Sequence, residues 1–430
     1  MSEGNWCRRQ FLQSLPAGVA AAGVLESLLQ ARAGFARSLE ALPQEPSPDW
    51  AALAAQYSLD KGITYFNHGS IGTIPIPLQE ARQKYLALCE SNPWLYMWET
   101  PWEAPRQQTR HKAAQLMGCG PDEVALTHNT TEGFNLLAAG LPLGAGDEVL
   151  FSSLNHPGAS ICWEHHGASR GYKVRRFKFP IQQTPEMGKE ELLDAYDRHI
   201  TRRTRVLAFP HIDNMVGLRH PIKELSALAR SKGVEFVAVD GAQSLGMIPV
   251  ELQGSGVDFY ACSPHKWLQA PKGLGLLYAR KQVQSQLRPI WVTWGQQRWK
   301  GTVRVFEDYG TRNLAEVLVL GDAIDFQARL GSKAKEARYR SLREHFRRRV
   351  EESSDLVWLS PARWEMGASL YSIQLRGKAS RQVFQTLYPQ RGMVFRAFGG
   401  SDLDAMRLSL NLFNRREEID RFIEAVQSLA

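Results

Sequence analysis

The chain has 430 residues, of which 43% are hydrophobic and 22% are charged, so its composition is that of a globular protein with room for two domains. The net charge is +8, but the densest basic run, residues 342–352, mixes both signs at helical spacing. This pattern favours a solvated helix face over a nucleic-acid-binding patch. The five cysteines have no metal-ligand spacing, and no apolar run is long enough to span a bilayer.

The first 33 residues resemble an export signal. Arg8 and Arg9 precede Phe11 and Leu12, a weakly apolar stretch follows, and residues 31–33 (Ala-Arg-Ala) offer a cleavage site. This pattern predicts a signal that the twin-arginine translocase recognises, and therefore a periplasmic protein without a stable membrane anchor. The alternative is an amphipathic N-terminal helix on a cytoplasmic protein.

A proline-rich linker and N-terminal segment over residues 34–60 separates the leader from the folded part. From residue 122 onward, apolar strand patterns alternate with helical ones, which predicts an α/β fold with a mostly parallel sheet between helices. The predicted strands are 123–129, 147–156, 205–214, 234–244 and 257–267, and the predicted helices between them are 130–141, 158–171 and 222–233.

The pattern changes after residue 312. A long helical region extends to residue 353, and short strands and a final helix over 416–430 follow. We therefore expect a large domain over 61–312 and a smaller C-terminal α+β domain over 313–430.

Polar side chains follow each of the five predicted strands. Because the carboxyl ends of parallel strands meet at one edge of an open sheet, these side chains are expected to form one site. Threonines at the start of the helix after the first strand would bind a phosphate with the free N–H groups there. The residues in strand order are Asn129, Thr130 and Thr131; His156; Asn214; Asp240 and Gln243; and Lys266.

This set fits pyridoxal phosphate. The cofactor needs a lysine for a Schiff base, a carboxylate beside its pyridine nitrogen, a stacking group and a phosphate cradle. Lys266 supplies the Schiff-base lysine and Asp240 the carboxylate. Lys266 lies between a histidine and a glycine-rich turn, so it is held in place more firmly than a surface lysine.

Several motifs resemble the class V aminotransferases, which are fold-type I pyridoxal-phosphate enzymes. The motifs are HNTTEGFN (128–135), VAVDGAQSLG (237–246), SPHKWLQAPKGLG (263–275), YGTRN (309–313) and MRLSLNLFNRREEIDRFIEAV (406–426). YFNHGSIG (65–72) and SNPWLYMW (91–98) are similar to the isopenicillin N epimerase-like branch. The resemblance covers residues 60–430.

The resemblance implies a role for each matching residue. Lys266 binds the cofactor covalently, Asp240 pairs with the pyridine nitrogen, and His156 stacks on the ring. Arg407 binds the substrate carboxylate as a bidentate fork. Asn214 and Gln243 reach the ring hydroxyl; Thr130, Thr131, Ser263 and His265 hold the phosphate; Thr311 reaches it across a homodimer interface; and Asn67 and His68 lie in a substrate-side loop. The alternative for His156 is a purely structural role. The alternative for Arg407 is an ion pair with a nearby acid.

The sequence indicates the cofactor more clearly than it indicates the reaction. Residues 393–407 contain no cysteine, so a desulfurase nucleophile is missing there. Free amino acids are metabolised mostly in the cytoplasm, so an exported enzyme is expected to modify an amino-acid residue in a peptide natural product, such as the glutamate group of a peptide siderophore. An epimerase, transaminase or C–S lyase acting on a free amino acid is one alternative, and a non-catalytic cofactor-binding protein is another.

Overall fold

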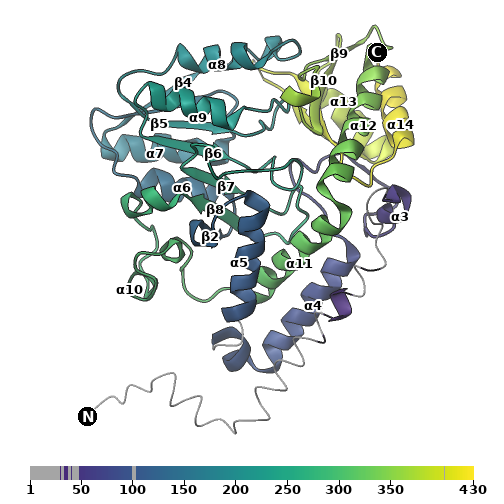
Figure 1. Cartoon of the computed structure of the whole chain (residues 1–430). Helices are drawn as coiled ribbons and strands as arrows, with labels where there is room; N and C mark the ends of the chain where they lie inside the picture. The colour runs from purple at the N-terminus through teal and green to yellow at the C-terminus, as the bar shows by residue number, and fades with distance from the viewer. Residues whose placement is uncertain (1–29, 31–32, 37–39, 41–47, 99–102, 401) are drawn as a thin grey trace, which may run out of the picture.

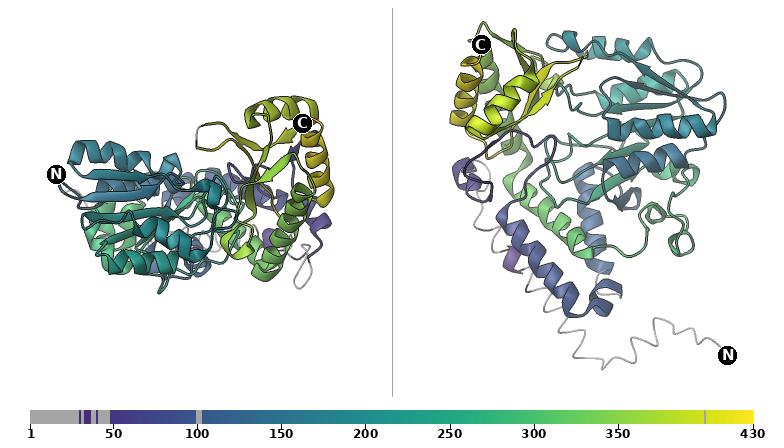
Figure 2. Two further views of the ribbon diagram at one scale, coloured as in Figure 1. Left: turned by 90° about the horizontal axis from the view of Figure 1, so that it is seen from above. Right: turned by 180° about the vertical axis from the view of Figure 1, so that it is seen from behind.

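A computed structural model describes residues 30, 33–36, 40, 48–98, 103–400 and 402–430. The paired arginines of the leader lie outside this part. The chain forms a large lobe around a seven-stranded sheet and a small lobe around a four-stranded sheet (Figures 1 and 2). None of the helices in the described ranges has the length and apolar character that a membrane crossing needs.

The large sheet is mostly parallel, as predicted. Only β8 runs antiparallel to its neighbours, β2 and β7. Its spatial order is β2 (Val124–Thr127), β8 (Gly275–Ala279), β7 (Phe259–Cys262), β6 (Phe236–Asp240), β5 (Thr204–Pro210), β3 (Glu148–Ser152) and β4 (Lys173–Phe177).

Helices cover both faces of this sheet, so its central strands are buried on two sides. In β6, Val237 and Val239 belong to one hydrophobic core and Phe236 and Ala238 to the other, following the alternation of side chains along a strand. One face packs against α6 (Thr130–Gly140) and α7 (Ile161–Arg170); the other packs against α5 (Glu103–Met117), α8 (Lys189–Asp197) and α9 (Ile222–Ser231).

The small lobe is an antiparallel sheet covered by helices. A third hydrophobic core lies between them. The strand order is β12 (Arg396–Phe398), β13 (Ala405–Ser409), β10 (Leu370–Leu375) and β9 (Leu356–Trp358), and the helices are α12 (Ser332–Glu351), α13 (Ser380–Arg391) and α14 (Arg416–Gln427).

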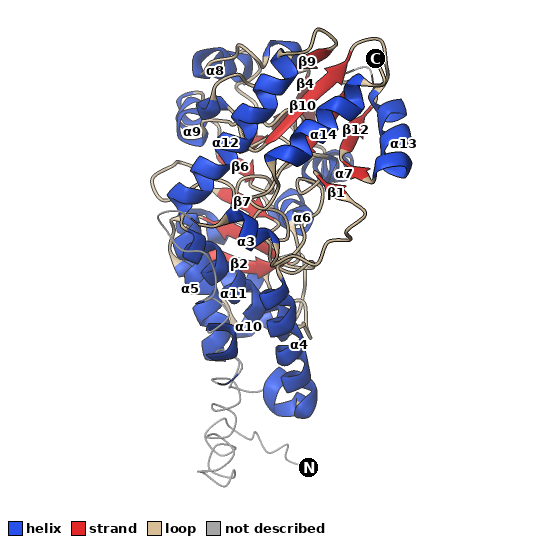
Figure 3. Ribbon diagram, turned by 90° about the vertical axis from the view of Figure 1, so that its right-hand side faces the viewer, coloured by secondary structure: helices blue, strands red, loops and turns tan. Residues whose placement is uncertain are grey.

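A long helix follows residue 312, where we expected the border between the two domains. Helix α11 (Leu314–Leu330) packs on α5 and on α4 (Ile76–Ser91) and contributes to the core of the large lobe (Figure 3). The chain turns into α12 at Gly331, where φ is 77°. Strand β1 (Thr64–Tyr65) pairs with β11 (Met393–Val394), so the segment after residue 61 joins the small lobe. Two shorter helices are α3 (Trp50–Ala54) and α10 (Gly295–Arg298).

Candidate active site

The predicted site residues on the central strands meet at one edge of the large sheet. Asp240 ends β6 and Lys266 follows β7, and these strands are parallel neighbours with Asp240 and Ala261 as Cα partners. Both side chains therefore reach the same edge. Arg407 arrives from β13 of the small lobe and donates from Nη1 to the carbonyl oxygen of Asn214 at 3.0 Å. Both lobes contribute to the site.

The surroundings of Lys266 favour a partly neutral amine. Burial lowers the pKa of Lys266 to about 8; Asp240 opposes this shift, and Arg407 adds to it. Asp240 is buried, and one of its carboxylate oxygens accepts a hydrogen bond from the N–H of Ala242 at 2.9 Å. An amine that is partly neutral near pH 8 can act as a nucleophile and can carry a proton.

A close backbone contact holds the turn that contains Lys266. Gly72, in the loop after β1, packs on the carbonyl oxygens of His265 and Lys266. A Cβ atom at position 72 would lie 2.4 Å and 2.5 Å from them. Only glycine allows this approach, so the loop after β1 and the lysine turn are held together.

Gln243 links the same two segments. Its Nε2 donates to the carbonyl oxygen of Gly69 at 2.7 Å, and its Oε1 accepts from the indole N–H of Trp267 at 2.9 Å. Asn214 is half-buried and contacts Arg407 through its main chain. The predicted contacts of these two side chains with a cofactor ring remain predictions; in the protein alone, Gln243 also joins the walls of the site.

The start of α6 presents the residues that were predicted to bind a phosphate. Asn129 caps the helix by accepting from the N–H of Glu132 at 2.8 Å. The Ser263 hydroxyl accepts from the N–H of Thr130 at 2.9 Å and lies 2.8 Å from its Oγ1. Thr131 is exposed, and a Cβ atom on Gly158 would lie 2.6 Å from its Oγ1. Hydroxyls and N–H groups at a helix N-terminus suit a phosphate.

Two histidines lie beside this cradle, and burial lowers the pKa of both. Burial lowers the pKa of His265 to about 4, helped by Lys266, and its Nδ1 is buried without a hydrogen-bond partner. The pKa of His156 is also lowered, first by desolvation; the charge of Asp240 opposes the shift, and that of Lys266 adds to it. His156 Nδ1 accepts from the N–H of Gly158 at 3.0 Å, which orients the ring.

Arg407 is a buried cation whose hydrogen-bond partners are all neutral. Besides the carbonyl of Asn214, it donates from Nη2 to Asn67 Oδ1 and to Ser70 Oγ, both at 2.7 Å. Its Nε is buried and unpartnered, and only 2% of the residue is exposed. Burial lowers the pKa of Arg407 to about 9, and Asp213 opposes the shift. A buried guanidinium with a free N–H calls for an anion.

Asp213, the acid whose charge opposes the lowered pKa of Arg407, forms its hydrogen bonds with the backbone. Asp213 accepts hydrogen bonds from the N–H groups of Met215 at 2.7 Å and Val216 at 2.8 Å, and from that of Leu218. Burial raises the pKa of Asp213 to about 6. It therefore shapes the turn after β5, and the reading of Arg407 as the partner of a nearby acid loses support.

The two residues of the predicted substrate-side loop have different surroundings. Asn67 holds Arg407, as described. His68 is fully buried between the rings of Tyr65 and Phe413, with centroids at 5.0 Å and 5.1 Å, and both of its ring nitrogens lack a partner. Burial lowers the pKa of His68 to about 3. Its position favours packing in the small lobe over direct substrate contact.

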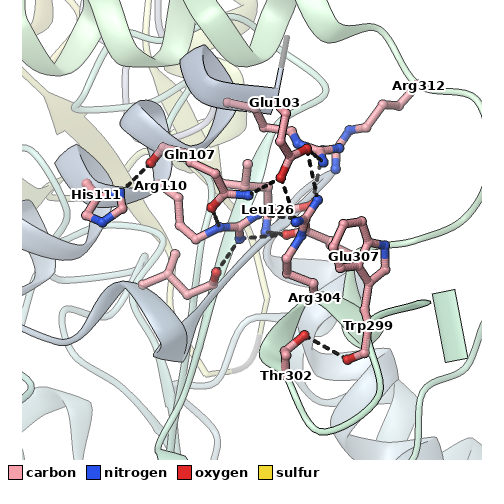
Figure 4. Close-up of polar contacts among 12 residues, drawn as sticks. Glu103, Gln107, Arg110, His111, Leu126, Trp299, Thr302, Arg304, Glu307 and Arg312 are labelled. Atoms are coloured by element: carbon pink, nitrogen blue, oxygen red, sulfur yellow. Dashed lines mark hydrogen bonds and ion pairs between the residues drawn. The ribbon is translucent and has the colours of Figure 1, made fainter. Parts of the chain in front are cut away.

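Thr311 is exposed on the single chain, in the segment between η7 (Val303–Phe306) and α11. A buried ion cluster anchors that segment (Figure 4). Glu307 accepts from Arg110 at 2.7 Å and 2.8 Å and from the N–H of Leu126 at 2.8 Å. Arg312 donates to the carbonyl of Leu126 at 3.1 Å, which ties the segment to β2.

The ion cluster was not predicted. Arg110 and Glu307 are separated by 197 residues, and no local pattern marks either one. The contacts of Ser70, which accepts from Arg407, and of Trp267, which donates to Gln243, were not predicted either. One signal was available: Arg304 and Glu307 stand three apart just before YGTRN, as an ion pair on a helical turn does. Within the described ranges, no group of acidic, histidine and cysteine side chains could hold a metal.

The fold and the site together match pyridoxal phosphate. A lysine and a carboxylate on neighbouring strands, beside a helix N-terminus, are the contacts that this cofactor needs. The unpartnered Nδ1 of His265 and Nε of Arg407 leave hydrogen-bonding capacity for a phosphorylated cofactor and an anionic substrate. The architecture is that of the fold-type I pyridoxal-phosphate enzymes.

Within that class, the chain belongs to the class V aminotransferase family, whose model matches residues 66–422. Isopenicillin N epimerase of Amycolatopsis lactamdurans is 31% identical over 401 residues, covering 89% of this chain and 98% of that protein. A probable cysteine desulfurase of Vibrio cholerae is 30% identical over 341 residues, covering 74% and 80%.

Solved structures agree on the fold. A cystine C–S lyase in complex with its product cysteine persulfide aligns with a TM-score of 0.76 at 23% identity, covering 85% of this chain and 97% of that one. A cysteine desulfurase from Escherichia coli aligns with a TM-score of 0.74 at 24% identity, covering 88% and 98%. The protein is thus a pyridoxal-phosphate enzyme, and the fold-class, family and cofactor predictions are confirmed.

Proposed function

We propose that the enzyme labilises the α-proton of an amino-acid residue within a peptide natural product, such as the glutamate group of a peptide siderophore, in the periplasm. The observation that supports it most is Arg407. A buried guanidinium with neutral partners and a free Nε, beside Lys266, suits the carboxylate next to the reacting carbon.

Bound pyridoxal phosphate withdraws electrons from the α-carbon of an amino acid. The protein supplies orientation and proton transfer. Arg407 holds the carboxylate, which directs the α-C–H bond toward the reacting lysine. Lys266, with a pKa of about 8, takes a proton at Nζ and returns it. Asp240, at the end of β6, would pair with the pyridine nitrogen, and the ring of His156, whose pKa is lowered by desolvation, would provide a flat surface for stacking.

Desulfurase chemistry is a poorer fit, although some relatives have that name. It needs a thiolate, and residues 393–407 contain no cysteine. The free cysteines of the described part lie elsewhere, and burial raises the pKa of Cys89 to about 11 and those of Cys119 and Cys162 to about 12. The similarity to isopenicillin N epimerases supports proton transfer at the α-carbon, as in epimerisation or transamination.

The periplasmic, peptide-directed part of the proposal rests on Arg8 and Arg9. Twin-arginine export moves folded proteins, which suits a site assembled from five distant segments. Replacing both arginines with lysine should leave the full-length enzyme in the cytoplasm, measured by cell fractionation with an antibody. Wild-type protein that stays cytoplasmic at full length would contradict this part and favour a free amino acid as substrate.

The reaction is tested with the metabolites of cells with and without the gene, compared by mass spectrometry, and then with the purified holoenzyme and the accumulated compound in D2O. We expect deuterium at the α-carbon of one amino-acid unit with wild type and none with Lys266→Ala. Turnover without loss of the α-proton would contradict the proposal.

A further inference from the structure

Arg396 and Arg407 lie directly opposite each other in the small-lobe sheet. They are Cα partners on the antiparallel strands β12 and β13. Directly opposite residues of an antiparallel pair point to the same face, with Cβ atoms about 5 Å apart. Arg396 is exposed and Arg407 is buried, so the pair extends from the interior of the site toward solvent.

The guanidinium groups of both arginines lie beside the ring of Phe398. The Cζ of Arg396 lies 5.7 Å from the ring centroid of Phe398, and the Cζ of Arg407 lies 6.0 Å from it. Phe398 is two residues after Arg396 on β12 and shares its face. The two cationic groups therefore lie beside the same ring.

Among the residues that the structure describes, none forms a salt bridge with Arg396. Asp402 pairs with Lys178 at 3.5 Å, and Asp404 accepts from the N–H of Ser380 at 2.9 Å. Like charges directly opposite each other in a sheet destabilise it. The arrangement is therefore unfavourable in the protein alone and becomes favourable when anions lie between or beside the arginines.

Arg396 also influences the reacting centre. Its charge lowers the pKa of Arg407, after burial, and contributes to the lowered pKa of His156, for which desolvation is the largest cause. The two arginines, His156 and Lys266 thus lie close enough to influence one another electrostatically, and the buried Nε of Arg407 has no partner.

We propose that Arg396 binds a second carboxylate of the substrate, so that the substrate has two free carboxylates: one beside the α-carbon, at Arg407, and one on a neighbouring group of the same molecule, at Arg396. The inference rests on the proposed function, because it takes Arg407 as the site of the first carboxylate. The exposure of Arg396 implies that the second carboxylate lies on the solvent side of the first one.

The test uses the holoenzyme and calorimetric titration with glutarate and with butyrate at constant ionic strength. The first acid has two carboxylates, and the second has one on a chain of similar length. We expect wild type to bind glutarate about tenfold more tightly, the contribution of one charge-assisted hydrogen bond. Arg396→Met should remove this preference and leave butyrate binding unchanged.

A matched control removes a charge elsewhere in the lobe. Arg376 directly follows Leu375, the last residue of β10, and is exposed. Arg376→Met should keep the preference for glutarate over butyrate. A preference that survives Arg396→Met, or equal affinities in wild type that depend on Arg407, overturns this inference and leaves the proposed function standing. The absence of any Arg407-dependent binding overturns both.

Discussion

The carboxylate of Glu307 accepts two hydrogen bonds from the guanidinium of Arg110, at 2.7 Å and 2.8 Å, and both side chains are 3% exposed. Burial alone would raise the pKa of Glu307, but Arg110 and Arg312 more than offset it and bring it to about 2. The pair anchors the segment that leads to Thr311.

Glu307→Gln should lower the free energy of unfolding by about 3 kcal/mol at pH 7, because it leaves Arg110 buried without a counter-charge. The folded-state pKa of Glu307 is depressed, so its stabilisation is present above the unfolded pKa of about 4 and is lost as pH falls toward 2. Urea unfolding of wild type and variant from pH 7 downward measures this difference.

The control is Lys281→Met, which breaks the exposed pair of Lys281 with Asp122. It should cost less than about 1 kcal/mol. A Glu307→Gln variant as stable as this control, or a difference that does not shrink on acidification, would show that the cluster contributes little.

The exposed position of Thr311 leads to a prediction about assembly. We expect a homodimer in which Thr311 completes the phosphate site of the partner subunit. Hybrids of a Lys266→Ala subunit and a Thr311→Ala subunit should then contain one site with both defects and one intact site. Activity of the mixed dimer at about half the wild-type level, measured after co-expression with two affinity tags, supports the shared site. No recovery over either parent, or a monomer by light scattering, contradicts it.

The lowered pKa of Lys266 predicts a distinct pH profile. Apoprotein treated with pyridoxal and cyanoborohydride should be labelled at Lys266 with a midpoint near pH 8, whereas an ordinary lysine needs a pH near 10. Asp240→Asn should move the midpoint lower, because Asp240 stabilises the charged amine. Site-resolved mass spectrometry measures the label, and exposed lysines of the same sample are the reference. A midpoint near 10 would contradict the prediction.

The raised pKa values of the free cysteines predict that no persulfide forms on them. Burial raises the pKa of all four free cysteines in the described part. Incubation with L-cysteine should therefore leave these thiols unmodified, and iodoacetamide at pH 7.5 should alkylate them slowly. Intact-mass measurement before and after incubation decides this. A persulfide on Cys119 would reopen the desulfurase reading.

The sequence predicted the parts of the fold and site that depend on local patterns. Apolar strands followed by polar residues place Asp240 and Lys266 at one edge, because parallel strands end together. Contacts between segments that are far apart in the chain could not be predicted from the sequence. The register that sets Arg396 against Arg407 depends on β12–β13 pairing, and the burial of His68 depends on Phe413, which is 345 positions away in the sequence. The packing of α11 on α4 and α5, which lie far earlier in the chain, could not be predicted from local patterns either.

The proposed chemistry depends on Lys266 as the residue that binds the cofactor. Borohydride reduction of the holoenzyme, followed by proteolysis and peptide mass spectrometry, tests it directly. We expect a pyridoxyl group on the peptide that contains Lys266 and none in the Lys266→Ala variant. Lys272 lies six residues further on and can be distinguished by fragmentation, so it is an internal control. A pyridoxyl group on Lys272, or on no lysine, would contradict the assignment of Lys266.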